Sequence, residues 1–270
     1  MKLLFSEHKS DYHNYIFPYA VWAFPEAAET PADLFAAGFL PSSRALDRFY
    51  LCRHLRVDLA RFEPSSENRR VLRKGAGIQF DLVPRARFEF TAARRAFYRT
   101  YADIKFGKGV MSDERLEALF ASPITSHLLL FTDSGTGAEV GTVTLYCQEP
   151  RMAYYYYGFY DLNYYRRNLG LYMMTAAAQL FAQRRARHLY LGSCYSANAL
   201  YKTKFAGAEF FNGTRWSPDT QELKYLVRRE EQPVRRHLLE TEDYVAGFLQ
   251  GDLAGLAAAS PFQVRLPASA

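Results

Sequence analysis

The sequence predicts an α/β protein with a mixed central sheet flanked by helices and a basic α+β portion at its N-terminal end. Residues 153–209 read as strand, glycine-containing turn, long helix, strand and second helix. Residues 125–131 and 139–148 are apolar runs around Asp133-Ser-Gly-Thr-Gly137, a strong hairpin signal. At 270 residues and 49% hydrophobic content, the chain can bury a sizeable core, as one large domain or two intimate ones.

The N-terminal elements follow from short apolar runs and from residues that favour helix starts. Residues 19–24 and 49–59 read as strands, and residues 31–37 as a short helix with Pro31 in its first turn. Residues 65–74 read as a basic helix that Ser65 or Ser66 would cap. Two further segments have helical patterns, residues 90–106 and 112–120.

The block from residue 153 to residue 209 carries most of the functional information. Its aromatic first strand, 153–160, is followed by Asp161, which can cap the helix that opens at Arg166 and runs to about Arg187. A helix N-terminus offers free backbone N–H groups and the positive end of the helix dipole, so a phosphate group is the expected ligand. The block ends with a strand and a helix, 188–192 and 198–207.

This order of elements resembles the GNAT acyltransferase fold, in which an R-x-x-G turn holds a cosubstrate's phosphates. Arg167-Asn-Leu-Gly170 matches that turn, and residues 198–207 are similar to the Tyr-bearing helix that follows it. The resemblance implies a phosphate-binding turn made by Arg166, Arg167, Asn168 and Gly170.

A second set of motifs resembles the arginyl-tRNA–protein transferases and their bacterial leucyl relatives. Residues 37–43, the Arg56-Val57 strand and residues 62–74 follow the family's "G-(W/F)-R-R-S", "R-V" and "F-x-P-S-x-S-Q-R-R" segments. Further matches come later in the chain, at Phe159-Tyr-Asp161, Asn168-Leu-Gly-Leu-Tyr172, Leu189-Tyr-Leu-Gly192, Leu200-Tyr-Lys202 and Arg215-Trp-Ser-Pro218. The resemblance covers roughly residues 35 to 227.

The chain also departs from that family. Its three cysteines, Cys52, Cys147 and Cys194, include no C-x-x-C pair, and four thiolates or a Cys/His set are needed to close a zinc or iron–sulfur site. We therefore expect no bound metal. Leu162 replaces the family's proline after Tyr-Asp, so the identity of the transferred amino acid cannot be carried over.

Net charge +6 and a pI near 9.1 indicate an anionic partner. The densest basic cluster is Arg69, Arg70, Arg73 and Lys74, which we interpret as an RNA-binding helix face, although a solvated face is the alternative. No apolar run approaches the roughly 18 residues of a membrane helix, and we expect a cytoplasmic protein without membrane or DNA partners.

Three residues are candidates for the chemistry of acyl transfer. Asp161 could orient the attacking amine or accept its proton, or could only cap the next helix. Tyr201 could protonate the leaving ribose oxygen, or could be a buried core tyrosine. Lys202 could equally bind phosphate or an acidic acceptor side chain.

The resemblance implies transfer of an amino acid from aminoacyl-tRNA, the cosubstrate, to an amine acceptor such as a protein N-terminus, with no other cofactor. Two alternatives stay open: an acyl-CoA-dependent N-acyltransferase, and a non-catalytic RNA-binding protein with the same fold. We divide the chain into a basic α+β region (1–110), a GNAT-like domain (111–228) and a C-terminal region (229–270), where we expect a charged helix at 228–250 and a loosely ordered tail at 254–270.

Overall fold

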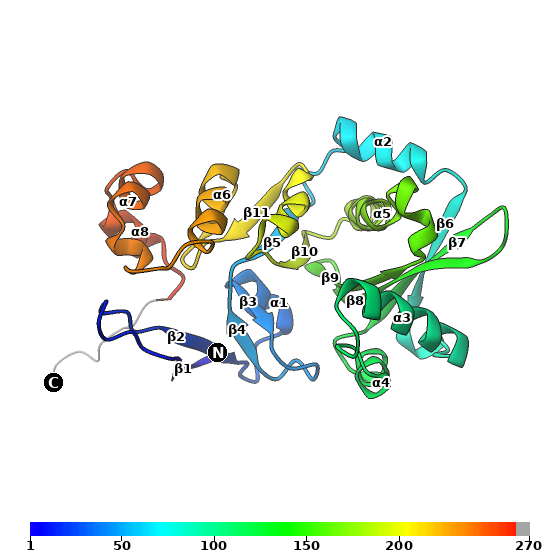
Figure 1. The fold of residues 1–270 in the computed structure, drawn as a ribbon, viewed down its shortest axis with the longest axis horizontal. Helices are drawn as coiled ribbons and strands as arrows, with labels where there is room; N and C mark the ends of the chain where they lie inside the picture. The colour runs from blue at the N-terminus through cyan, green and yellow to red at the C-terminus, as the bar shows by residue number, and fades with distance from the viewer. Residues whose placement is uncertain (263–270) are drawn as a thin grey trace.

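The computed structural model describes residues 1–262, which form a four-stranded and an eight-stranded sheet with helices around them (Figure 1). The small sheet has the order β1-β2-β4-β3, and the large sheet has the order β12-β11-β5-β10-β9-β8-β7-β6. The strands of the small sheet are β1 (Lys2–Glu7), β2 (Tyr19–Phe24), β3 (Phe39–Pro41) and β4 (Phe49–Leu51). The predicted α/β class is confirmed.

The remaining elements have these bounds. The strands of the large sheet are β5 (His54–Asp58), β6 (Ile78–Pro84), β7 (His127–Asp133), β8 (Glu139–Gln148), β9 (Met152–Tyr160), β10 (His188–Ser193), β11 (Ala208–Phe211) and β12 (Trp216–Ser217). The α-helices are α1 (Pro31–Ala36), α2 (Ser66–Lys74), α3 (Ala92–Lys105), α4 (Asp113–Ala121), α5 (Leu169–Gln183), α6 (Thr220–Arg229), α7 (Glu242–Leu249) and α8 (Leu253–Ala259). The 3-10 helices are η1 (Arg85–Arg87), η2 (Leu162–Arg167), η3 (Ala197–Lys204) and η4 (Leu238–Glu240).

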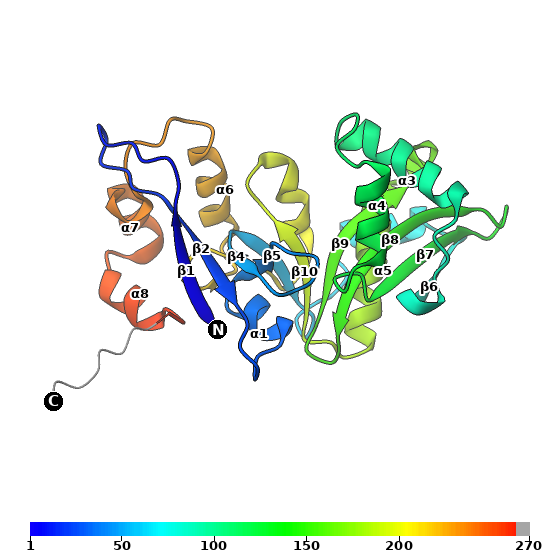
Figure 2. The ribbon, with the colours of Figure 1, turned by 90° about the horizontal axis from the view of Figure 1, so that it is seen from below.

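Two helical layers cover the antiparallel strands β6 to β9. Alternate side chains of β7 enter different layers, because a strand points successive residues to opposite faces. Leu129 and Phe131 pack in the cluster that contains α5, whereas Leu128 packs with α3 and α4. Figures 1 and 2 show α5 on one face of these strands and α3 and α4 on the other. The predicted hairpin of β7 and β8 is confirmed.

The parallel strands β9 and β10 separate soon after they begin. They pair through only three residue pairs, from His188 opposite Met152 to Tyr190 opposite Tyr154. β9 continues to Tyr160, and its residues 155–160 have no pairing with β10. Helix α5 makes the crossover between the two strands, as the sequence predicted. The carboxyl ends of β9 and β10 therefore diverge (Figure 2).

A strand from the first quarter of the chain completes the large sheet. β5 lies between β10 and β11, antiparallel to both, with Asp58 opposite His188 and Val57 opposite Ala208. At the far edge, β6 pairs with β7. Residues 54–84 thus contribute to the same sheet as the predicted domain 111–228, and the boundaries at 110 and 228 stay predictions.

Two predicted helices and one strand have different limits. The long helix begins at Leu169 rather than at Arg166, because Asn168 takes a left-handed conformation (φ 57°) that separates η2 from α5. The helix predicted at 198–207 is the 3-10 helix η3. The strand predicted at 49–59 is divided at Cys52 and Arg53, where the chain passes from the small sheet to the large one.

The prediction for the C-terminal region was wrong. In place of one helix at 228–250, α6 ends at Arg229 and α7 begins at Glu242, with Pro233 in the connection, where it lacks the N–H that a continuing helix needs. The tail predicted from residue 254 contains most of α8. Its last residues, 263–270, lie outside the described residues. Strand β1, which the sequence did not suggest, pairs along its full length with β2.

Candidate active site

Lys202 lies at the carboxyl end of β10, where β9 and β10 diverge. Its Nζ donates to the carbonyl of Ser193, at 3.1 Å. A Cβ placed on Gly192 would lie 3.8 Å from this Nζ and 3.9 Å from the Tyr154 hydroxyl, so both polar groups lie over the Gly192 backbone. Burial lowers the pKa of Lys202, which favours its neutral amine. A partly desolvated amine at the end of a strand is suited to exchanging a proton with a ligand.

Tyr201 belongs to a group of four tyrosines that we call the tyrosine cluster: Tyr101, Tyr155, Tyr160 and Tyr201. Tyr101 and Tyr155 are buried, and the Tyr101 and Tyr160 ring centroids are 4.9 Å apart. Burial raises the pKa of Tyr201, and the nearby Tyr160 phenol adds to the effect. Tyr201 therefore keeps its proton near neutrality while 41% of its surface stays exposed, so it can donate to a ligand.

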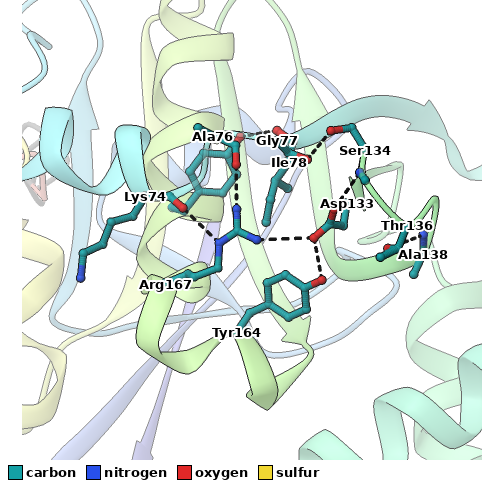
Figure 3. A network of polar contacts seen from close by, with 12 residues as sticks. Lys74, Ala76, Gly77, Ile78, Asp133, Ser134, Thr136, Ala138, Tyr164 and Arg167 are labelled. Atoms are coloured by element: carbon teal, nitrogen blue, oxygen red, sulfur yellow. Dashed lines mark hydrogen bonds and ion pairs between the residues drawn. The ribbon is translucent and has the colours of Figure 1, made fainter.

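Arg167 has its guanidinium engaged by the protein itself (Figure 3). Nη2 donates to the carbonyl of Ala76 (2.7 Å) and Nε to that of Lys74 (3.2 Å). Nη1 lies 3.4 Å from the Asp133 carboxylate, which also accepts from the Tyr164 hydroxyl at 2.7 Å. These bonds join the end of α2, the β7–β8 turn and η2. Arg167 is a structural residue of this turn. Phosphate binding by its guanidinium stays a prediction, and the contacts that already engage this group speak against it.

The other predicted phosphate ligands are placed differently. Arg166 is exposed at the end of η2, and its carbonyl accepts from Lys74 Nζ at 3.4 Å. Asn168 precedes α5, and its side chain makes no capping bond. A Cβ on Gly170 would lie 2.8 Å from the Tyr160 ring, so this glycine is required first by packing against the tyrosine cluster. A larger residue at position 170 would displace Tyr160 before it met any ligand.

Asp161 caps the element that follows it. Its carboxylate accepts from the backbone N–H of Asn163 at 2.9 Å, and its own N–H donates to the carbonyl of Val140. The capping role that the sequence allowed is therefore present, and it acts on η2 rather than on α5. A role for Asp161 in proton transfer stays a prediction.

The predicted RNA-binding helix α2 lies beside the phosphate turn. Arg69, Arg73 and Lys74 are exposed, but Arg70 forms a bidentate pair with Glu67 and Arg69 Nη1 donates to the carbonyl of Pro64 at 2.6 Å. Ser65 caps the helix, as predicted. The contacts of Lys74 with Arg166 and Arg167 bring the two predicted sets together into one basic surface, the α2–η2 surface.

No group of three or more His, Cys, Asp or Glu side chains that could hold a metal gathers within residues 1–262. Cys52 and His54 are neighbours, with Sγ 3.8 Å from Nδ1, but burial raises the pKa of the Cys52 thiol to about 12 and lowers that of His54 to about 3. In the same part of the chain, every helix is too short or too polar to cross a bilayer.

Sequence reasoning missed three members of the tyrosine cluster. Tyr160 stood inside the Phe-Tyr-Asp motif, and Tyr155 inside the run of four tyrosines, but neither had a signal that separated it from core aromatics. Tyr101 comes from α3, more than 50 residues before β9, so only the tertiary structure places it beside Tyr160.

The sequence is similar to curated bacterial proteins named aspartate/glutamate leucyltransferase. It is 26% identical to the one from Ruegeria pomeroyi over 176 residues, 63% of either chain. It is 26% identical to that of Dinoroseobacter shibae over 72% of this chain and 74% of the relative, and 29% identical to that of Halorhodospira halophila over 61% and 71%. No family model matches. These matches confirm the resemblance to the leucyl-tRNA–protein transferases.

Solved structures with a similar arrangement include L-PGS from Bacillus licheniformis, with a TM-score of 0.42 and 14% identity over 65% of each chain. A GCN5-related N-acetyltransferase from Sphaerobacter thermophilus has a TM-score of 0.36 and 15% identity, covering 71% of this chain and 57% of that one.

Proposed function

We propose that this chain, a divergent relative of the bacterial leucyl-tRNA–protein transferases, is an aminoacyltransferase that moves an amino acid from aminoacyl-tRNA to an amine of a protein acceptor. The observation that carries the proposal is its similarity to proteins named aspartate/glutamate leucyltransferase. The acceptor amine that fits this class most directly is a protein N-terminus.

The reaction asks little covalent chemistry of the protein. The acceptor nitrogen attacks the ester carbonyl carbon, a C–N bond forms, and the C–O bond to the ribose breaks. The ammonium must lose a proton and the ribose oxygen must gain one. Because the ester is already activated, holding the two reactants together supplies much of the acceleration.

The groups at the carboxyl end of β10 match these two proton transfers. Lys202 has a pKa lowered by burial and can take the proton of the amine, directly or through water. Tyr201 has a pKa raised by burial and can give a proton to the leaving oxygen. Asp161 remains the alternative acceptor for the amine's proton.

The α2–η2 surface would hold the RNA. Arg73, Lys74 and Arg166 are exposed there and can contact phosphates, and the first turn of α5 offers backbone N–H groups next to Gly170. The terminal adenosine would then lie between this turn and the tyrosine cluster, where aromatic rings can stack with a base.

Single-turnover transfer tests the proposal. The chain is mixed with each of several labelled aminoacyl-tRNAs, leucyl-tRNA first, and with a peptide whose N-terminus is free or acetylated. We expect label on the free peptide and none on the acetylated one. Label from acyl-CoA instead of aminoacyl-tRNA would replace the proposal by CoA-dependent acylation. Tight tRNA binding without any transfer would indicate a non-catalytic RNA-binding protein.

Three variants separate the proton-transfer roles. Lys202→Gln should reduce the transfer rate by roughly the 10²–10⁴-fold of a lost general base while tRNA affinity stays near the parental value. Tyr201→Phe should have a smaller effect, because a ribose oxygen is already a tolerable leaving group. Asp161→Asn keeps an oxygen that can accept from Asn163, so a parental rate in this variant would leave Asp161 as a cap only.

A further inference from the structure

A second basic site lies outside the segments that form the candidate active site, between the C-terminal end of α6 and the start of α7. A cavity of about 530 Å³ opens there. Four arginines line it, Arg228, Arg229, Arg235 and Arg236, together with one carboxylate, that of Asp243. We call it the arginine pocket.

In the described part of the chain, most of the positive charge of this pocket has no ion-pair partner. Arg229 donates to the carbonyl of Arg236 at 2.5 Å and so folds the connection back onto α6. The Asp243 carboxylate accepts from the Tyr225 hydroxyl at 3.1 Å. Within residues 1–262, the side chains of the other three arginines form no ion pair or hydrogen bond with a protein acceptor, and all three are exposed. A pocket with three free guanidinium groups is suited to binding an anion.

Exposed aromatic rings lie on a connection that touches the segment next to the pocket. The connection between β1 and β2 carries Tyr12 and Tyr15, which are 73% and 67% exposed, followed by Phe17. The backbone N–H of Phe17 donates to Nε2 of His237, at 3.3 Å, so this connection touches the segment that follows Arg236. The Tyr12 and Tyr15 ring centroids are 5.6 Å apart. Large rings that face solvent, on a connection that contacts the residue after Arg236, offer stacking surfaces for bases.

The pocket is linked to the end of β10. Arg53 pairs with Glu230, the residue after α6, at 2.9 Å. The same guanidinium donates to the carbonyl of Cys194 at 2.7 Å. Cys194 follows Ser193, whose carbonyl accepts from Lys202. Arg53 therefore connects the residue that follows α6 with the end of β10 that carries the Lys202 contact.

We propose that the arginine pocket and the aromatic residues Tyr12 and Tyr15 form a second RNA-binding site, which takes the phosphodiester backbone and the unpaired bases of a single-stranded or loop region. This inference rests on the proposed function, because it assigns the site to the RNA that carries the amino acid. An acidic peptide would pair with the arginines but would leave the exposed rings without partners, so RNA accounts for both features.

The test measures binding of unacylated tRNA and of a single-stranded RNA oligonucleotide over a range of salt concentrations. The pocket variant carries Arg228→Gln, Arg235→Gln and Arg236→Gln. A matched control removes three positive charges elsewhere, by Arg87→Gln, Lys108→Gln and Arg187→Gln, at exposed positions. The aromatic variant carries Tyr12→Ala and Tyr15→Ala. Thermal unfolding of each variant, expected near the parental value, shows that the fold is kept.

We expect the pocket variant to lower the slope of log K against log salt by about 2, because each lost contact to a single strand contributes roughly 0.7. The control should leave the slope nearly unchanged. The aromatic variant should lose about tenfold in affinity or more with little change of slope, because stacking does not release counterions. We expect this pattern, in which the pocket variant changes the salt slope and the aromatic variant changes the affinity, only for a site that binds both phosphates and bases.

Equal losses of RNA affinity and of salt slope in the pocket and control variants would contradict the proposed site. So would a pocket variant that binds tRNA like the parent but no longer binds a glutamate-rich peptide. If the parent transfers amino acids and the pocket variant binds normally, only this inference fails. If the pocket variant loses RNA affinity while the parent transfers no amino acid, the RNA-binding site is supported and the proposed function is contradicted.

Discussion

The α2–η2 surface and the arginine pocket are both rich in arginine, but their guanidinium groups have different partners. On the first surface, Arg70 is paired with Glu67, Arg69 donates to Pro64, and Arg167 binds two carbonyls and Asp133. In the pocket, Arg229 alone is used in this way by residues 1–262. A basic run in a sequence therefore overstates the number of guanidinium groups that a ligand can meet. Among the residues that the structure describes, three of the four pocket arginines have no such contact, compared with two of the five arginines on the α2–η2 surface, Arg73 and Arg166.

Arg166 and Arg167 give the sharpest test of this difference, because they are neighbours with opposite surroundings. Arg167→Gln should lower the free energy of unfolding by roughly 0.5–1.5 kcal/mol, since it removes the hydrogen bonds to the Lys74 and Ala76 carbonyls and the ion pair with Asp133. Arg166→Gln should change it by less than about 0.5 kcal/mol and should weaken tRNA binding instead. Urea denaturation and tRNA titration of both variants measure the two effects. Equal stabilities would contradict the structural role of Arg167.

The pH dependence of stability tests the partner of Arg167. The Tyr164 hydroxyl, two backbone N–H groups and Arg167 lower the pKa of Asp133 below its ordinary value of 3.8. A lowered carboxyl pKa stabilises the folded state above the unfolded value and loses that effect as the pH falls through the folded value. Asp133→Asn should therefore be less stable than the parent at pH 7, and the difference should shrink below pH 4. A difference that grew on acidification would exclude this linkage.

On α2 the comparison predicts unequal roles for two adjacent arginines. Arg73→Gln should weaken tRNA binding and reduce the salt slope by nearly one unit, as for one phosphate contact. Arg70→Gln should have a smaller effect on both, because Glu67 already holds its guanidinium. The salt titrations described above measure this pair. Identical slopes for the two variants would mean that the Arg70–Glu67 pair opens for RNA.

The smallest expected effect is a gain. Glu67→Gln removes the carboxylate that holds Arg70 and should raise tRNA affinity by up to severalfold at low salt, with the increase vanishing at high salt. Stability should stay near the parental value, because an exposed i,i+3 pair contributes little. Unchanged affinity at every salt concentration would place Arg70 outside the RNA contact.

The elements with local signals were predictable, and those that depend on distant partners were not. The hairpin around Gly135, the Ser65 cap and the strand–turn–helix–strand order of residues 153–193 are coded by neighbouring residues, and the structure confirms them. The break at Pro233 also had a local signal, but the charged pattern on either side of it favoured one continuous helix.

The site was only partly predictable for the same reason. The motifs indicated Tyr201, Lys202 and the turn, since these lie close together in the sequence. The use of Arg167 depends on carbonyls of Lys74 and Ala76, about ninety residues away, and Tyr101 reaches the cluster from α3. The arginine pocket depends on the fold of the connection after α6. The sequence alone does not show which arginine side chains are already hydrogen-bonded or paired within the protein.

The position of β5 has a consequence for the order in which the molecule forms. Because β5 lies between β10 and β11, the eight-stranded sheet is complete only when residues 54–58 have paired with residues 188–193. Contacts this far apart in the chain carry a large loop-closure entropy and slow the folding reaction. During synthesis, β5 must also wait unpaired until the ribosome has released Ser193. Until then the N-terminal segment exposes a strand with two free edges, and we expect refolding from denaturant to be slow and prone to aggregation at high protein concentration.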